Sequence, residues 1–215
     1  MGKLFVIEGT DGSGKSTQLK MVCDKLDSMG IKYRKIVFPR YEEDSATLIR
    51  MYLGGAFGKN PGDVNPYAAS TFFAVDRYAS FKTDWEKDYL DGVPIICDRY
   101  TTSNAIHQAS KLPDMEIDGF LDWLFDYEYR MLGIPAPTDV FFLDMPSELS
   151  FQLIKKRQGE SGDIHELDHD YLRRCREKSA HVCDRLNWLR VPCAKDGVLR
   201  TPEEINSDIM ERILK

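Results

Sequence analysis

The sequence predicts an α/β fold organised around a parallel β-sheet, and three observations carry this prediction. Short apolar runs alternate along the chain with longer amphipathic segments of helical spacing. A Gly-rich turn joins the first apolar run to the first helical segment. The length of 215 residues, of which 42% are hydrophobic and 30% charged, suits one globular domain with a sizeable core. We therefore expect a single domain over residues 1–215.

The N-terminal part of the chain has the pattern of a βαβ unit. Residues 3–8 form an apolar run that predicts a strand, and a helical pattern follows until Gly30, which is typical of a helix C-cap. A second strand is predicted over residues 33–38. Because a connection of helical length separates the two strands, we expect them to be parallel and to pair in one sheet.

The rest of the chain continues the alternation. The longest helical pattern begins near Pro66, a favoured first-turn residue, and ends at Leu90, just before Gly92. Residues 159–163 (GESGD) predict a surface loop. Further strands are expected over 93–97, 138–143 and 189–193, and further helices over about 45–53, 103–111, 118–132, 147–157, 169–189 and 202–214.

Composition and charge disfavour several classes of function. The 29 basic and 35 acidic residues give a net charge of −6, which disfavours general nucleic-acid binding because that binding depends on basic surfaces. No apolar run approaches the roughly 18 residues needed to cross a bilayer, and the N-terminus lacks the pattern of a targeting segment. We therefore expect a cytoplasmic chain without nucleic-acid or membrane partners. The five cysteines contain no CxxC pair and are expected to be buried thiols without a function.

The turn after the first strand carries the most specific motif. Residues 9–16, GTDGSGKS, match GxxxxGK[ST] between a predicted strand and a predicted helix. Such glycines let backbone N–H groups converge on phosphate oxygens, and the helix N-terminus adds a positive field. Lys15 is expected to hold the β- and γ-phosphates and the Ser16 hydroxyl to ligate Mg²⁺. The cofactors expected are ATP and Mg²⁺, and the ATP-binding residues are Gly9, Gly12, Ser13, Gly14, Lys15, Ser16 and Thr17.

A second polar site follows the strand predicted over residues 93–97, which runs into Asp98-Arg99-Tyr100. The Asn-Lys-x-Asp guanine-reading pattern of GTPases is absent from the sequence. An Asp beside an Arg indicates a metal ligand, Asp98, next to an anion clamp, Arg99, which favours a phosphorylated acceptor over water. The alternative interpretation is a structural ion pair that caps the sheet.

Together with three further blocks, these motifs make the chain resemble the thymidylate kinases, a family of nucleoside monophosphate kinases. The blocks are EGTDGSGKST at 8–17, FPR at 38–40, FFAVDR at 72–77, DRYTTSN at 98–104 and the basic segment at 155–157. The resemblance implies a three-layer α/β/α P-loop NTPase fold with a five-stranded parallel sheet. It also implies a short lid at about 155–168, a homodimer built from helices, and transfer of the γ-phosphoryl group of Mg-ATP to dTMP.

The same resemblance implies roles for individual residues. Phe73 would stack on the thymine, and Arg77, one turn later on the same helix, would hydrogen-bond the base. Asp11 would bind the sugar 3′-hydroxyl near the metal, Asn104 would contact the base edge, and Arg40 and Arg99 would grip the acceptor phosphate. The expected catalytic residues are Asp11, Lys15, Arg99 and Arg157, and the expected substrate-binding residues are Asp11, Phe38, Arg40, Phe73, Arg77, Arg99, Asn104 and His107.

Two positions depart from the family pattern. Ser13 stands where some members carry Arg, so the extra positive charge is expected from Arg157, with Lys155 and Lys156 as further candidates. The alternative is that these basic residues only form a solvated helix end. His107 stands where the family usually has Tyr or Phe beside the sugar. Because imidazole can hydrogen-bond a 2′-hydroxyl, we expect weaker discrimination against ribonucleotides than in a Tyr-bearing relative.

Other functions remain open at this point. The chain could be a P-loop kinase for another pyrimidine nucleotide such as dUMP, for another nucleoside monophosphate or for a deoxynucleoside. It could also be a nucleotide-binding regulatory module without turnover. Residues 165–169 spell HExxH, the zinc-hydrolase pattern, but they follow a predicted loop and have no companion motif, so we expect no zinc site there.

Overall fold

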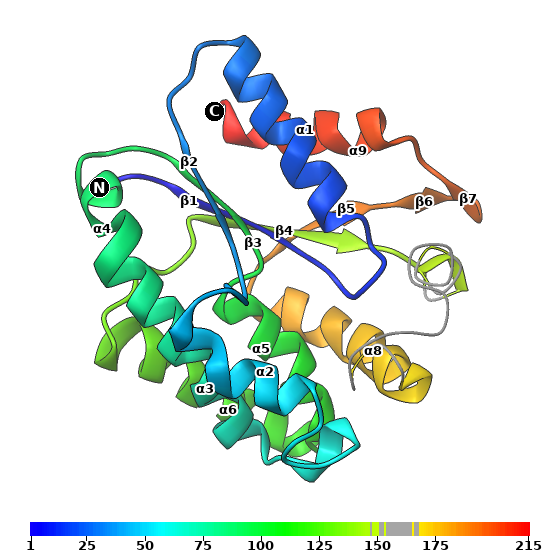
Figure 1. Ribbon diagram of the computed structural model, residues 1–215. Helices are drawn as coiled ribbons and strands as arrows, with labels where there is room; N and C mark the ends of the chain where they lie inside the picture. The colour runs from blue at the N-terminus through cyan, green and yellow to red at the C-terminus, as the bar shows by residue number, and fades with distance from the viewer. Residues whose placement is uncertain (147, 151–152, 154–164, 166–167) are drawn as a thin grey trace.

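The centre of the molecule is one sheet of five parallel strands. The structure is a computed structural model that describes residues 1–146, 148–150, 153, 165 and 168–215 (Figure 1). The strands follow the order β2-β3-β1-β4-β5 and every neighbouring pair is parallel. They are β1 (Leu4–Glu8), β2 (Arg34–Val37), β3 (Ile95–Asp98), β4 (Asp139–Asp144) and β5 (Leu189–Pro192). The predicted α/β class and five-stranded parallel sheet are confirmed.

The first two strands do not pair with each other, so that part of the prediction is wrong. Strand β3 lies between them and pairs with both, with Ile7 and Val37 each opposite Asp98. All four residues of β3 are buried, whereas β2 alternates and has exposed positions, which suits an edge. The consequence for the site is that Asp98 lies beside the end of β1, where the Gly-rich turn begins.

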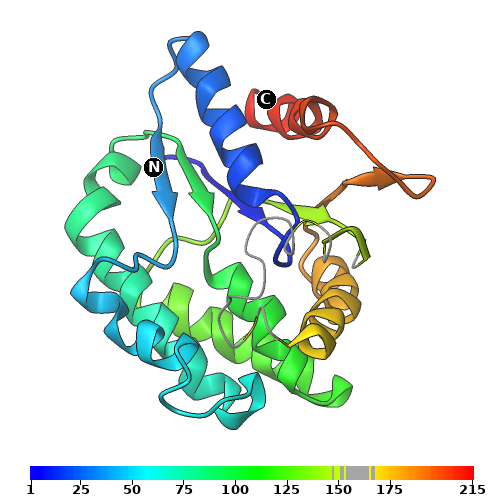
Figure 2. The ribbon, with the colours of Figure 1, turned by 45° about the vertical axis from the view of Figure 1, so that its right-hand side comes forward.

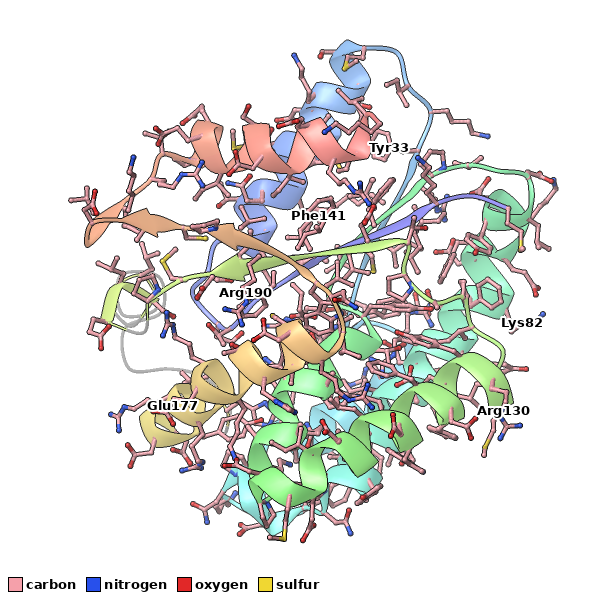
Figure 3. The ribbon with its side chains drawn as sticks, turned by 180° about the vertical axis from the view of Figure 1, so that it is seen from behind. Tyr33, Lys82, Arg130, Phe141, Glu177 and Arg190 are labelled. Carbon is pink, nitrogen blue, oxygen red and sulfur yellow. The ribbon has the colours of Figure 1, made fainter. Side chains whose placement is uncertain are left out.

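Helices cover both faces of the sheet. On one face lie α1 (Lys15–Ser28) and α9 (Pro202–Ile213), and on the other lie α3 (Pro66–Ser80), α5 (Thr101–His107), α6 (Asp114–Phe125) and α8 (His169–Arg185) (Figures 1 and 2). Gln18 joins the first two helices, since its side-chain amide donates to Pro202 O at 3.0 Å and accepts from Asn206 at 3.2 Å. Figure 3 shows Phe141 of β4 in the interior beneath α1 and α9.

Two predicted helices are interrupted by π-helical turns. The predicted helix over 66–90 consists of α3, the π-helical turn η3 (Phe81–Trp85) and α4 (Glu86–Leu90), and α6 is followed by a second such turn, η5 (Asp126–Met131). A π-turn widens the helix, and in η3 both Phe81 and Trp85 are buried with ring centroids 4.7 Å apart. In η5 the wider turn contains a fully buried acid, Glu128.

Shorter elements complete the described chain. The expected helix over 45–53 begins with a 3₁₀ turn, η1 (Asp44–Ala46), and continues as α2 (Thr47–Leu53). Two-residue strands β6 (Ala194–Lys195) and β7 (Val198–Leu199) form an antiparallel hairpin that no periodicity could predict. Further 3₁₀ turns are η2 (Pro61–Asp63) and η4 (Ala109–Lys111). Most of the helix predicted over 147–157 lies outside the described residues. None of the described helices is both long and apolar enough to cross a membrane.

Candidate functional site

A cavity of about 430 Å³ lies at the carboxyl ends of the central strands, the usual ligand position in parallel α/β sheets. The Gly-rich turn after β1 and the Asp98-Arg99 pair at the end of β3 form one end, and residues of α3 and α5 form the other. The predicted site residues that line it are Asp11, Gly12, Gly14, Lys15, Ser16, Thr17, Phe38, Phe73, Arg77, Asp98, Arg99, Asn104 and His107. Motifs separated by up to about 90 residues in the sequence thus meet in one space.

The turn between β1 and α1 requires glycine for its backbone. Gly12 and Gly14 have φ values of 76° and 91°, in the left-handed region that other residues adopt with strain. A Cβ on Gly14 would meet nothing within 4 Å, so the backbone conformation and not the available space requires glycine there. The Lys15 ammonium folds back over the turn and donates to Gly9 O and Thr10 O, each at 2.9 Å. Burial, with the nearby Arg99 charge, lowers the pKa of Lys15 to about 8.

Two buried oxygen atoms, one in the Gly-rich turn and one at the end of β3, have no hydrogen-bond partner within the described part of the chain: Ser13 Oγ and Asp98 Oδ1. A buried carboxylate oxygen left unpaired is costly, so a cation beside it would be stabilising. The Ser16 side chain lies exposed on the cavity wall. Hydroxyl and carboxylate oxygens are ligands that Mg²⁺ accepts, so Ser16 and Asp98 fit the predicted metal position.

Arg99 lines the cavity and forms an ion pair with Asp11. Its φ is +63°, which is uncommon for a residue with a side chain and is often found at functional sites. Burial by itself would raise the pKa of Asp11, but the positive charges of Arg99 and Lys15 hold it well below its usual range. Asp11 is therefore a permanent carboxylate between two cations.

Glu8, the last residue of β1, supports this cluster and was not predicted. Its carboxylate is fully buried and accepts hydrogen bonds from Gly9 N, Thr102 Oγ1 and Ser103 Oγ at 2.9, 2.7 and 2.8 Å. The carboxylate also lies 3.8 Å from the Arg99 guanidinium. An acid at the end of an otherwise apolar buried strand was the available signal in the sequence.

The other end of the cavity has an aromatic and polar wall. Phe73 and Arg77, one turn apart on α3, both line the cavity as predicted. Arg77 is buried, and its Nε and Nη2 donate to Glu128 Oε2 and Oε1 at 2.6 and 2.5 Å. Asn104 on α5 donates to Ser70 O of α3 at 3.3 Å and so joins the two helices.

His107 closes this wall, and both of its ring nitrogens have neighbours. Nε2 is 3.3 Å from Arg99 Nη1, and Nδ1 is 3.6 Å from Cys175 Sγ. The ring stacks on His165 at 5.8 Å between centroids, and His165 Nε2 is hydrogen-bonded to Tyr52 Oη at 2.8 Å. Burial, with the Arg99 charge, lowers the pKa of His107 to about 3, so the imidazole is neutral near pH 7. A neutral ring that faces the Arg99 donor accepts at Nε2 and carries its proton on Nδ1.

Some predicted residues lie elsewhere. Gly9, Ser13 and Arg40 do not line the cavity. Arg40 bonds through Nε to Asp76 Oδ1 at 3.2 Å and through Nη2 to Ser45 Oγ at 3.0 Å. Arg157 and its basic neighbours at 155 and 156 are outside the described residues, as is most of the predicted lid. Helix α8 begins at His169, so His165, in a turn, is not on one helical face with it as a zinc hydrolase requires.

Gln108 also lines the cavity and was not predicted. It is buried, and its Oε1 accepts no hydrogen bond from any residue that the structure describes. Gln108 follows Asn104 by four residues, so the helical spacing that related Phe73 to Arg77 could also have related these two amides. An unpaired amide oxygen beside a cavity is suited to accept a hydrogen bond from a ligand.

The chain is similar to known proteins in sequence and in fold. The family model described as thymidylate kinase matches residues 7–205. A thymidylate kinase of Mycobacterium tuberculosis is 29% identical over 181 residues, which cover 80% of this chain and 81% of that protein. A thymidylate kinase of Brachyspira hyodysenteriae is 30% identical over 158 residues, 74% of this chain and 70% of that protein. The solved thymidylate kinase of Candida albicans shares the fold, with a TM-score of 0.71, 22% identity and coverage of 99% and 91%.

Proposed function

The chain belongs to the thymidylate kinase family, so it is a phosphotransferase that acts on dTMP, and we propose that the cavity described above holds both of its substrates. The turn at residues 9–16 binds the triphosphate of ATP, and the wall formed by α3 and α5 binds dTMP. One observation carries this proposal: the Gly-rich turn, the Arg99 guanidinium and an aromatic wall line the same cavity of about 430 Å³. Two anionic substrates can meet there.

In the proposed reaction an oxygen of the dTMP phosphate attacks the γ-phosphorus of ATP. The bond from that phosphorus to the oxygen of the β-phosphate breaks, so ADP leaves and dTDP forms. The attacking oxygen is already anionic near pH 7, so no general base is required, and catalysis consists of alignment and charge neutralisation. Two unit charges about 4 Å apart repel by roughly 4 kcal/mol at an effective dielectric of 20, so unscreened substrates would not approach each other.

The residues of the cavity supply this screening. Lys15 leaves its two carbonyl acceptors to hold the β- and γ-phosphates. Arg99 leaves Asp11 and binds the dTMP phosphate, which releases the Asp11 carboxylate for the sugar 3′-hydroxyl. Mg²⁺ bound by Ser16 and Asp98 would add positive charge beside the transferred group. The predicted contribution of Arg157 stays a proposal that the described residues do not address.

The base binds at the far end of the cavity. Phe73 provides the stacking face, and Arg77 donates to a base carbonyl. Asn104 and Gln108 provide side-chain amides at the same wall, and the Gln108 oxygen, which has no hydrogen donor among the described residues, suits the N3–H of thymine. Arg40 follows Phe38 and Pro39, which line the cavity, and Asp76 and Ser45 fix two of its guanidinium nitrogens.

A coupled assay of ADP release over a panel of acceptors tests the proposal. The panel contains dTMP, dUMP, dCMP, the ribo analogue of dTMP and thymidine. We expect dTMP to give the highest kcat/KM. A maximum at thymidine would instead support a deoxynucleoside kinase, a maximum at dUMP the other pyrimidine nucleotide, and absence of turnover with every acceptor would support a regulatory nucleotide-binding module.

We further propose that the chain forms a homodimer through α2 and α3. Each of these neighbouring helices exposes an apolar pair at i, i+3 spacing: Leu48 and Met51 on α2, and Val75 and Tyr78 on α3. Apolar residues of this size exposed on adjoining helices are typical of an interface between subunits. The cavity lies beside the same helices, so the dimer would stabilise the wall that carries Phe73.

A further inference from the structure

Arg77 forms a buried ion pair with Glu128, and Glu128 has no role among the residues assigned above. Arg77 is 2% exposed and Glu128 is fully buried. Thr101 Oγ1 donates to Glu128 Oε2 at 2.8 Å, and Arg77 Nη1 lies 3.4 Å from Tyr100 O. Burial works against the charged guanidinium, but the Glu128 carboxylate outweighs it and raises the pKa of Arg77 above its usual value. The guanidinium therefore stays charged inside the protein.

The geometry of the pair determines which donors remain for a ligand. Arginine has five N–H groups in one plane, and Nε and Nη2 form one edge of that plane. Glu128 occupies this whole edge through two parallel hydrogen bonds. One N–H of Nη1 points to Tyr100 O. Among the described residues nothing else accepts from Arg77, so one N–H on Nη1 and one on Nη2 are left, and Arg77 lines the cavity.

We propose that Glu128 is a positioning residue for base selectivity, because it fixes the guanidinium of Arg77 so that its two remaining N–H donors are held towards the base. This inference rests on the proposed function, in which the base lies against Phe73 and Arg77. These N–H groups can donate to the 4-keto oxygen of thymine or uracil. They meet the 4-amino group of cytosine donor to donor, which leaves buried N–H groups without partners.

The carboxylate is needed for this effect because it has only acceptor atoms. Replacement by the amide of Gln puts an N–H₂ group against one of the two Arg77 donors, so the bidentate pair is lost and the guanidinium can rotate. A rotated guanidinium presents its donors less well to a keto group and excludes an amino group less well. Loss of the pair is therefore expected to weaken binding of dTMP relative to dCMP. A purely structural role would instead weaken binding of every nucleoside monophosphate equally.

The test measures binding of dTMP and of dCMP by calorimetry, and kcat and KM for dTMP and ATP, in wild type and Glu128→Gln. We expect the affinity ratio of dTMP to dCMP to fall by about tenfold or more, since a lost hydrogen bond in a specific polar site costs at least that factor. KM for dTMP should rise while kcat and KM for ATP change by less than about twofold. The control is Glu86→Gln, which removes the same charge from an ion pair with Lys82 at the surface. It should leave the affinity ratio, kcat and both KM values unchanged.

Two further variants make the outcome decisive. Glu128→Asp keeps the charge but withdraws the carboxylate from Arg77. It should fold and should lower the affinity ratio of dTMP to dCMP by a smaller factor than Glu128→Gln does. If Glu128→Gln does not fold, Glu128→Asp provides the test of the positioning role. In an Arg77→Met background Glu128→Gln should leave the ratio unchanged. An unchanged ratio in a folded Glu128 variant, with wild type active on dTMP, overturns the positioning role alone. Failure of wild type to bind dTMP overturns the proposed function as well.

Discussion

At the scale of single residues, the cavity is organised by charges that neutralise one another before any substrate arrives. Asp11 lies between Arg99 and Lys15, and the Lys15 ammonium is further held by two backbone carbonyls. Each substrate phosphate can replace a protein acceptor that already binds the same cation. The site thereby keeps buried charges paired in both states, which limits the cost of burying them.

Replacing Lys15 by Ala removes the cation that would follow the transferred phosphoryl group. We expect kcat to fall by about a hundredfold or more, because loss of one group that stabilises developing charge typically costs that factor. The fold should be retained, since the Lys15 side chain bonds only to the turn itself among the described residues. Lys20→Ala, on the exposed side of the same helix, is the control for the assay. Near-normal turnover in a folded Lys15→Ala variant would show that the turn has another role.

His107 is expected to determine how well the sugar is discriminated. When Arg99 moves to the acceptor phosphate, the neutral imidazole loses its neighbour at Nε2 and can accept from a 2′-hydroxyl. His107→Phe removes this acceptor and keeps a ring of similar size. The ratio of kcat/KM for dTMP to that for its ribo analogue should rise by about tenfold. Cys175→Ala, which changes the neighbour behind the ring, is the control, and an unchanged or lower ratio in His107→Phe would refute the expectation.

At the scale of elements, the features that could be predicted are those that follow from hydrophobic periodicity and from turn and capping residues. Strand β1 was predicted because residues 4–7 are all apolar. Helix α9 begins at Pro202 because Thr201 and Glu204 form a capping box. The position of β3 between β1 and β2 could not be predicted, because strand order depends on packing that is distant in the sequence. The two π-helical turns could not be predicted either, because their residues are equally compatible with a regular helix.

The site residues divide in the same way, into those that a local motif predicts and those that depend on contacts distant in the sequence. Residues in local motifs, such as Lys15 and Arg99, could be assigned from the sequence. Glu128 could not, because its function depends on an ion pair with Arg77, 51 positions away. Glu8 and Gln108 had weak local signals, an acid that ends an apolar strand and an amide at helical spacing. Buried polar partners of this kind are recognised by their three-dimensional contacts alone.

Lys111 joins η4 to α2, and its burial gives a pH dependence to stability. Its ammonium donates to Tyr52 Oη at 2.8 Å and to Val64 O at 3.2 Å, and burial lowers its pKa to about 7. Between pH 7 and its ordinary value of 10.5 the unfolded chain binds more protons, so the folded state gains stability as pH rises through this window. Below pH 7 both states carry the charge, and the dependence disappears.

Urea unfolding of wild type and Lys111→Met at pH 7 and pH 9 measures this contribution. The free energy of unfolding of wild type relative to the variant should rise by about 1 kcal/mol across the interval, a value halved to allow for solvent screening of a half-buried group. The other titrating groups contribute equally to the free energy of unfolding of both proteins, so their effect cancels in this difference. Parallel behaviour of the two proteins would show that Lys111 has an ordinary pKa.

At the scale of the whole molecule, two chains are expected to meet through the exposed apolar residues of α2 and α3. Wild type should sediment at twice the mass of one chain, and Val75→Glu, which puts a charge into the proposed α2–α3 interface, should sediment as a monomer. Leu90→Glu makes the same change at an exposed site on α4 and should stay dimeric. A wild-type protein that is monomeric at micromolar concentration would contradict the interface.

The account as a whole depends on one cavity that receives two phosphorylated ligands end to end. Calorimetric titration with a dinucleotide in which adenosine and thymidine are joined through their 5′ positions by a phosphate chain tests this directly. We predict one site per chain and an affinity well above that of ATP or dTMP alone, because the joined ligand loses translational freedom only once. Binding no tighter than ATP alone, or displacement by ATP but not by dTMP, would contradict the account.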